Sequence, residues 1–187
     1  MAIEHPPVTE CLVEEKGVTA YTNQFLMIDA RLEKIQQKTA RFLRSQGWKA
    51  FVIPPDTDKQ DPRFAARLYD LFPHKTAATC AGLGWVGKNG LLVTRAYGAR
   101  LSWATVLTDA PLTVCDAPFL VGQCKACQRC AEICPAQAIS AEEWVRESSG
   151  QSKIDTRACA AQLGENYQAL GSYICGLCIM VCPLCRK

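Results

Sequence analysis

The cysteines of this chain are closely spaced and unevenly distributed. Ten of the twelve lie at or after position 115. Four of these form the run Cys124-x2-Cys127-x2-Cys130-x3-Cys134-Pro135. Such spacing lets one loop wrap three corners of a small iron-sulfur cluster, while the fourth thiolate reaches a second cluster. Zinc is the competing ligand, but its usual Cys-x2-Cys pairs leave the third close thiol and the Cys-Pro ending unexplained.

A second copy of the motif follows near the end of the chain. Cys175-x2-Cys178-x3-Cys182-Pro183 repeats the spacing that starts at Cys127, but Ser172 stands where the first copy has Cys124. Cys159, between the copies, is the natural replacement for the missing thiolate. The duplication predicts two [4Fe-4S] clusters that exchange one ligand each. We expect cluster I to be held by Cys124, Cys127, Cys130 and Cys182, and cluster II by Cys134, Cys159, Cys175 and Cys178.

Four cysteines have no ligand role in this scheme. Cys11 and Cys80 are expected to be buried bystanders, the common fate of a free cysteine. No role is assigned to Cys115. Cys185 could form a redox dithiol with Cys182, but Cys182 is better used as a cluster ligand, so Cys185 is expected to be incidental. A disulfide framework is typical of small secreted chains, and no Cys-x2-Cys-His occurs for covalent haem attachment.

Composition indicates a soluble globular protein. Hydrophobic residues make up 49% of the chain and charged residues 21%, with a mean hydropathy of -0.03. The net charge of +3 comes with no block of like charges, so we expect no direct nucleic-acid ligand. The first residues lack the apolar core of a signal peptide, and no apolar stretch is long enough for a membrane helix. We therefore expect a cytoplasmic protein with no membrane partner.

The elements that must position the cysteines begin with a helix. Apolar residues recur at helical spacing from Ile28 to about Gln46, and Gly47 follows at the position of a C-cap. The core-facing residues of this helix are expected to be Ile28, Leu32, Ile35, Phe42 and Leu43. A short apolar run, 50–53, then predicts a buried strand that ends at two prolines.

The middle of the chain predicts a second helix and two strands. The helix is expected at 64–72, after a polar loop. The strands are expected at 91–94 and 101–107, which are rich in branched and aromatic residues, with a turn at Tyr97-Gly98 between them. The cysteine pattern begins soon after, so a domain boundary is expected between Pro111 and Gly122. The two domains are then 1–115 and 116–187.

A glycine-rich segment precedes the first of these strands. Gly82-Leu-Gly84-Trp-Val-Gly87 satisfies the G-x-G-x-x-G pattern for dinucleotide binding, but that pattern requires a strand before it and a helix after it. Here 76–81 has helical character and 91–94 has strand character, which is the reverse order. We therefore expect no Rossmann-type site.

The wider segment Ala81-Gly-Leu-Gly-Trp-Val-Gly-Lys-Asn89, followed by Leu107-Thr-Asp-Ala-Pro-Leu112, resembles the signature of the epoxyqueuosine reductase family. The cysteine order agrees, including a lone Cys159 after an aspartate and an arginine. The resemblance extends from Lys75 to Pro183 and includes the reductive dehalogenases more distantly. It implies an α/β (α+β), nitroreductase-like, corrinoid-binding domain with a shortened N-terminal part, followed by a bacterial-ferredoxin-like 2[4Fe-4S] domain.

The resemblance also implies functional residues outside the cysteines. Family members use an aspartate upstream of the glycine signature as proton donor, for which Asp70 is a loose match and His74 a replacement. A lone histidine is more often structural. The cobalamin-binding candidates are Gly82, Gly84, Trp85, Gly87, Lys88 and Asn89. The glycines would let backbone approach a flat ligand and Trp85 would offer an aromatic face, with chain turning and loop support as the rival roles.

Two functions remain after these observations. The first is an iron-sulfur oxidoreductase that passes electrons from a flavodoxin-type or ferredoxin-type donor to a cobalamin-dependent reduction site. Its substrate would be a small molecule or a modified nucleoside. The second is a non-catalytic 2[4Fe-4S] electron-transfer protein without corrinoid.

Overall fold

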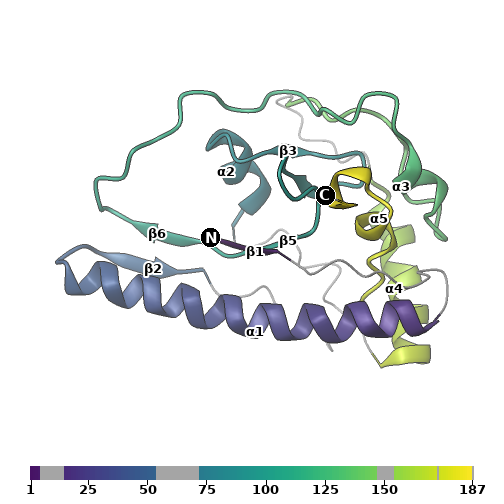
Figure 1. The fold of residues 1–187 in the computed structure, drawn as a ribbon, viewed down its shortest axis with the longest axis horizontal. Helices are drawn as coiled ribbons and strands as arrows, with labels where there is room; N and C mark the ends of the chain where they lie inside the picture. The colour runs from purple at the N-terminus through teal and green to yellow at the C-terminus, as the bar shows by residue number, and fades with distance from the viewer. Residues whose placement is uncertain (5–14, 54–71, 147–153, 172, 187) are drawn as a thin grey trace.

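The structure of the chain, a computed structural model, describes residues 1–4, 15–53, 72–146, 154–171 and 173–186 (Figure 1). Its elements are β1 (Ala2–Glu4), α1 (Glu15–Ser45), β2 (Ala50–Val52), α2 (His74–Cys80), β3 (Trp85–Val86), β4 (Leu92–Val93), β5 (Leu101–Trp103), β6 (Val106–Thr108), α3 (Arg129–Glu132), α4 (Thr156–Leu170), α5 (Leu177–Met180) and a 3-10 turn, Pro183–Arg186. The mixed α/β content agrees with the expected class. The helix expected at 64–72 lies almost wholly outside the described residues.

Helix α1 is longer than predicted and is rotated relative to the prediction. It begins at Glu15 rather than near Ile28. The buried face runs through Tyr21, Ile28, Leu32, Gln36 and Ala40. Ile35 and Phe42, which we expected in the core, are 41% and 62% exposed. The buried residues recur every four positions from 28 to 40, so the buried face includes Gln36 and the small Ala40. Ile35 and Phe42 therefore point toward solvent.

Gln36 explains why a polar side chain belongs on that buried face. Its Nε2 donates to the carbonyl oxygens of Ile53 at 2.8 Å and Thr105 at 2.6 Å. These carbonyls belong to the residues that follow β2 and precede β6. The single amide therefore joins α1 to both strands. It supplies a donor to the Ile53 carbonyl and a second donor to the Thr105 carbonyl, which also accepts the Ile53 N–H at 3.2 Å.

The helix ends as its glycine predicted. Gly47 has φ of +87°, its N–H donates to the Arg44 carbonyl, and the N–H of Trp48 donates to the Leu43 carbonyl. This pair of bonds is a Schellman motif, in which the left-handed residue is usually glycine. The chain is thereby reversed so that β2 runs back along α1 (Figure 1).

The described strands form three antiparallel pairs, β1 with β5, β2 with β6 and β3 with β4. The strand after α1 is confirmed, but it is not buried: Phe51 is 62% exposed and lies opposite Leu107, which is 42% exposed. The segment 101–107 was expected as one strand and is two. Its chain changes partner at residues 104–105, leaving β1 and joining β2, and neither half pairs with β4.

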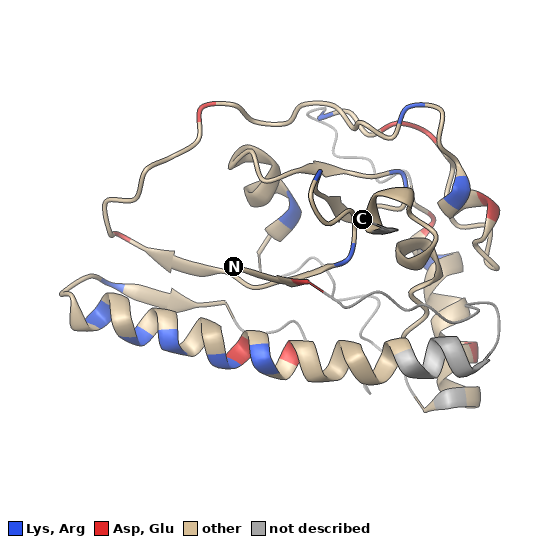
Figure 2. Ribbon diagram, viewed as in Figure 1, with Lys and Arg blue, Asp and Glu red and all other residues tan. Residues whose placement is uncertain are grey.

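The exposed face of α1 is more basic than composition suggested. Its exposed cations are Arg31, Lys34, Lys38, Arg41 and Arg44. Three-residue and four-residue spacing places them along the side of the helix away from the core, toward its β2 end (Figure 2). These cations are neighbours in space and not in sequence, so they form no block of like charges in the sequence itself.

The two copies of the cysteine motif adopt the same local structure. Each has a four-residue helical turn, α3 or α5, that begins one residue before the middle cysteine of its copy. Equivalent hydrogen bonds close the turns: Ile133 N–H donates to the Arg129 carbonyl, and Val181 N–H donates to the Leu177 carbonyl, each at 3.1 Å. The duplication in sequence is thus a duplication in structure. Among the helices that the structure describes, none combines the length and apolarity that crossing a membrane requires.

Candidate metal centre

Four of the predicted ligands lie close enough to influence one another's ionisation near α3. Burial raises the pKa of Cys130 to about 11, and the charges of Cys124 and Cys127 add to the effect. Burial also raises the pKa of Cys124, with a smaller contribution from Cys182. These residues are the four that the sequence predicts for cluster I.

A second group of four lies between α4 and α5. Burial raises the pKa of Cys159, and the charges of Cys134 and Cys175 raise it further. Burial likewise raises the pKa of Cys178, which is affected by all three of these cysteines and also by Cys130. Binding of the thiolates to iron would offset the cost of removing these thiol protons, since the thiolate is the form that binds iron.

The second group also shares one cavity. Cys134, Cys159, Cys175 and Cys178 all line a space of about 260 Å³. Most of its other lining residues are apolar: Pro135, Ala136, Ala138, Ile139, Ile154, Leu163, Ile174, Leu177 and Ile179. Four cysteines that line one apolar cavity match the donor set of a [4Fe-4S] cluster.

The spacing of the donors also bears on the metal. Over the residues that the structure describes, no three His, Cys, Asp or Glu side chains converge where one metal ion could bind them all. The thiolates of a cubane each bind a different iron at a different corner, so they lie farther apart than the ligands of a single zinc ion.

The two groups are adjacent. Helical turn α3 carries Cys130, and α5, which packs against α3, carries Cys178. These two thiols, one from each group, are close enough for the charge of Cys130 to raise the pKa of Cys178. Electrons could therefore pass between the two sites through this contact.

The cysteines without predicted roles differ among themselves. Cys185 is 4% exposed and hydrogen-bonds through its side chain to Cys182, which lowers the pKa of Cys182 to about 6 despite burial. Sequence reasoning missed this contact because it treated Cys185 as incidental. Cys80 was expected to be buried and is exposed, as is Cys115. Cys11 lies outside the described residues.

The glycine-rich segment is tightly packed. A Cβ on Gly84 would collide with the carbonyl oxygen of Val93, and a Cβ on Gly87 would lie 2.7 Å from Cγ2 of Val93. Trp85 is 2% exposed and its ring packs against Phe119 at a centroid distance of 5.8 Å. These glycines and the tryptophan thus have packing contacts that account for their residue types.

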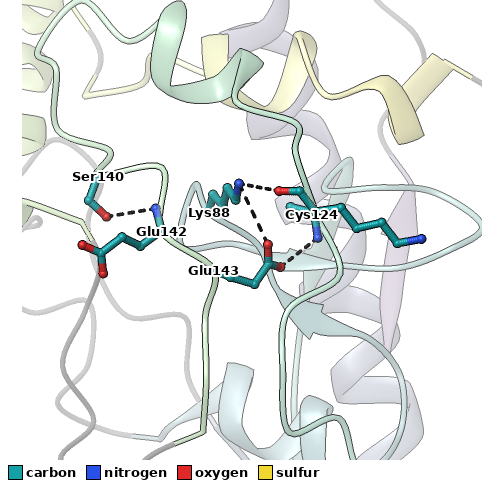
Figure 3. A network of polar contacts seen from close by, with 6 residues as sticks. Lys88, Cys124, Ser140, Glu142 and Glu143 are labelled. Carbon is teal, nitrogen blue, oxygen red and sulfur yellow. Dashed lines mark hydrogen bonds and ion pairs between the residues drawn. The ribbon is translucent and has the colours of Figure 1, made fainter.

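The next two residues reach both groups of cysteines. Lys88 is 5% exposed, and its Nζ donates to the Lys125 carbonyl at 2.6 Å and lies 4.0 Å from Oε2 of Glu143 (Figure 3). Oε1 of Glu143 accepts the N–H of Cys124 at 2.8 Å (Figure 3). Nδ2 of Asn89 donates to the Cys178 carbonyl at 3.3 Å. Lys88 therefore supports the loop of cluster I, and Asn89 supports that of cluster II.

A further cavity, of about 330 Å³, lies beside the second group of cysteines. Tyr21 and Phe25 of α1 line it together with Asn89, Cys159 and Ala160. It also borders residues of the 260 Å³ cavity, because Cys159 lines both. The site is large enough for a small organic molecule.

The other candidate residues lie apart from this cavity or cannot be placed. Gly82 and Gly84 line a different cavity, of about 650 Å³. His74 begins α2, and its Nδ1 is 2.8 Å from Oγ1 of Thr105. Asp70 lies outside the described residues.

Comparison with known proteins identifies the cysteine-rich segment. Residues 123–184 match the family described as 4Fe-4S double cluster binding domain. The chain is 37% identical over 117 residues to tetrachloroethene reductive dehalogenase from Dehalobacter restrictus, covering 61% of this chain and 18% of that protein. It is 37% identical over 134 residues to epoxyqueuosine reductase from Synechocystis sp., covering 67% and 45%, and 31% identical over 170 residues to that of Pseudomonas aeruginosa, covering 84% and 40%.

Solved structures show the same relationship at the level of fold. A catabolic reductive dehalogenase superimposes with a TM-score of 0.71 at 23% identity, over all of this chain and 25% of that one. Epoxyqueuosine reductase from Streptococcus thermophilus gives 0.55 at 18% identity, over all of this chain and 48% of that one. The chain spans less than half the length of these relatives. It is thus an iron-sulfur protein homologous to epoxyqueuosine reductases and reductive dehalogenases, with a 4Fe-4S double cluster binding domain at residues 123–184.

Proposed function

We propose that this chain is an oxidoreductase that moves electrons through two [4Fe-4S] clusters held by eight cysteines. When bound, the clusters supply one-electron transfer. Cluster I is assigned to Cys124, Cys127, Cys130 and Cys182, and cluster II to Cys134, Cys159, Cys175 and Cys178. The observation that carries the proposal is the cavity of about 260 Å³ lined by all four cysteines of the second set. Its walls are mostly apolar, and partial burial of the thiols favours metal-bound over free thiolates.

Metal and sulfide analysis tests this proposal. Protein purified without oxygen is expected to contain about eight iron and eight sulfide per chain, as two cubanes require. A Cys80→Ala variant, altered at an exposed cysteine outside both sets, is the control and should keep the same content. Stoichiometric zinc without sulfide would refute the proposal.

We further propose that electrons leave through the cavity of about 330 Å³ beside Cys159. This cysteine lines both cavities, so an acceptor there would lie next to a cluster II ligand. Cobalamin is the acceptor that the resemblance to epoxyqueuosine reductase suggests, within a nitroreductase-like domain at 1–115 that precedes the cluster domain at 116–187. The cavity accommodates one edge of a corrin ring, and not a whole cobalamin.

A cavity-filling substitution tests the acceptor site. Ala160 lines the cavity from α4, so Ala160→Phe would occupy it without removing a cysteine. Ala161→Phe, at an exposed position on the same helix, is the matched control. Cobalamin binding is measured by absorption spectroscopy. We expect saturable binding by the parent and the control. Ala160→Phe should lose this binding while its iron content is unchanged. Equal binding by both variants would refute this site.

The second candidate function is a 2[4Fe-4S] electron-transfer protein without corrinoid. The packing of Trp85 and Gly84 is compatible with it, because their contacts with Phe119 and Val93 account for both residue types without a corrinoid. Absence of cobalamin binding by the parent, with both clusters present, would select this function. In either case we propose a flavodoxin-type or ferredoxin-type electron donor and a cytoplasmic location. For the enzyme, we propose a small molecule or modified nucleoside as substrate and His74 as candidate proton donor.

A further inference from the structure

One polar atom of Trp85 lacks an ordinary partner. The side chain lies in the core with Val93, Ala99 and Cys185. Within the described part of the chain, its buried Nε1–H has no hydrogen-bond partner. A buried donor without an acceptor is costly, and such groups in native proteins usually have an explanation.

The sulfur of Cys124 is the candidate acceptor. Cys124 packs against the core that contains Trp85, and the Trp85 side chain and the Lys88 backbone both lower the pKa of its thiol, although burial raises that pKa overall. A Cβ on Gly87 would lie 3.6 Å from Sγ of Cys124, so the backbone between Trp85 and Lys88 passes directly beside the sulfur. The segment 85–88 thus surrounds this cysteine on the side of the α/β domain.

We propose that Trp85 is a positioning residue that raises the reduction potential of cluster I by donating its Nε1–H to Sγ of Cys124. The inference rests on the proposed function, because it requires Cys124 to be a cluster ligand. Reduction adds negative charge that spreads onto the thiolates, and a hydrogen-bond donor stabilises the more negative state more strongly. Hydrogen bonds to ligand sulfurs are accordingly one of the protein's means of setting a cluster potential.

The test is a redox titration of both clusters by electron paramagnetic resonance in the intact holoprotein. The signals are assigned with Cys159→Ala, which removes a ligand of cluster II only. Trp85→Phe removes the indole N–H. At fixed potential it is expected to lower the ratio of reduced to oxidised cluster I about tenfold, a shift of about 59 mV for one electron. Cluster II should be unchanged.

Two further variants separate the hydrogen bond from packing. Site-specific 3-benzothienylalanine at position 85 keeps a bicyclic ring of similar shape and lacks only the N–H, so it should shift cluster I in the same direction even if Trp85→Phe fails to fold. Trp103 has a buried Nε1–H with no partner among the described residues, but no contact with Cys124 is found for it. Trp103→Phe should therefore leave the potential of cluster I unchanged.

The outcomes distinguish the two proposals. An unchanged cluster I potential in the benzothienylalanine protein, or equal shifts of both clusters, would overturn the role of Trp85. Absence of clusters from the parent protein would instead overturn the proposed function. A shift confined to cluster I in both position-85 variants, and absent from Trp103→Phe, would establish the hydrogen bond.

Discussion

Gly176 separates two ligands of cluster II, and replacing it with alanine tests how helix α1 supports that cluster. The residue has φ of +80°, and an added Cβ would collide with the ring of Tyr21. Tyr21 is 2% exposed, so the collision would occur in a buried part of the molecule. The charges of Cys175 and Cys178 contribute, after burial, to a raised pKa of Tyr21, which places the same ring beside both ligands.

The cost of Gly176→Ala has two parts. A left-handed conformation costs an ordinary residue about 1–2 kcal/mol, and overpacking a buried site costs about 1–3 kcal/mol. The expected loss of unfolding free energy is therefore about 2–5 kcal/mol. Gly171 is the matched control, because its φ is +69° and an added Cβ meets nothing within 4 Å. Gly171→Ala should lose only the first part, about 1–2 kcal/mol.

Urea unfolding of the iron-loaded proteins without oxygen measures the difference. With a denaturant slope of about 1–3 kcal/mol/M, Gly176→Ala should unfold about 1 M earlier in urea than Gly171→Ala. Cluster II should also be lost before cluster I. In the double variant Tyr21→Ala/Gly176→Ala the collision is absent, so the glycine substitution should cost no more than at Gly171. Equal midpoints for the two single variants would refute the packing of Tyr21 against this loop.

Three other predictions concern ligands and their supports. Cys159→Ala should abolish the electron paramagnetic resonance signal of cluster II and leave that of cluster I, whereas two intact signals would exclude Cys159 as a ligand. Gln36→Leu should destabilise the protein by about 1–3 kcal/mol by leaving the Ile53 carbonyl without the Gln36 donor, whereas the Thr105 carbonyl keeps the Ile53 N–H. Gln37→Leu, on the exposed side, should change stability by less than about 0.5 kcal/mol in the same urea assay. Asp155→Ala should cost about 1 kcal/mol by removing the N-cap of α4 and should speed loss of iron from cluster II to a chelator, with Asp155→Asn restoring the parent rate.

The spacing of the cysteines predicted more of the site than any other feature. Cys134, Cys159, Cys175 and Cys178 line one cavity, although Cys159 lies far from the other three in sequence. The assignment of the eight cysteines to two clusters stays a prediction. Short spacing restricts a loop to a few conformations around a cluster, so the pattern carries three-dimensional information. The hydrogen bond from Cys185 to Cys182 could not be predicted in this way, because a free thiol has no spacing rule.

The errors in the fold have a common physical origin in long-range contacts. The buried face of α1 was misplaced because Gln36 is buried by carbonyl groups 17 and 69 residues away. The segment 101–107 is split because its first half pairs with β1, which lies near the N-terminus and far from this segment in sequence. Helical periodicity and the C-cap at Gly47 are local, and both were predicted correctly. Local rules succeed where the neighbours along the chain supply the partners.

The contacts of the glycine-rich segment, residues 82–89, bear on the choice between the two proposed functions. Trp85 and Lys88 contact the cluster I side, and Asn89 bonds to the Cys178 carbonyl on the cluster II side. A chain that binds only the two clusters would need these residues as much as a chain that also binds cobalamin. Presence of the motif therefore does not favour the reductase over the electron carrier. Occupancy of the cavity beside Cys159 is the property on which the two functions differ, and the comparison of Ala160→Phe with Ala161→Phe measures it directly.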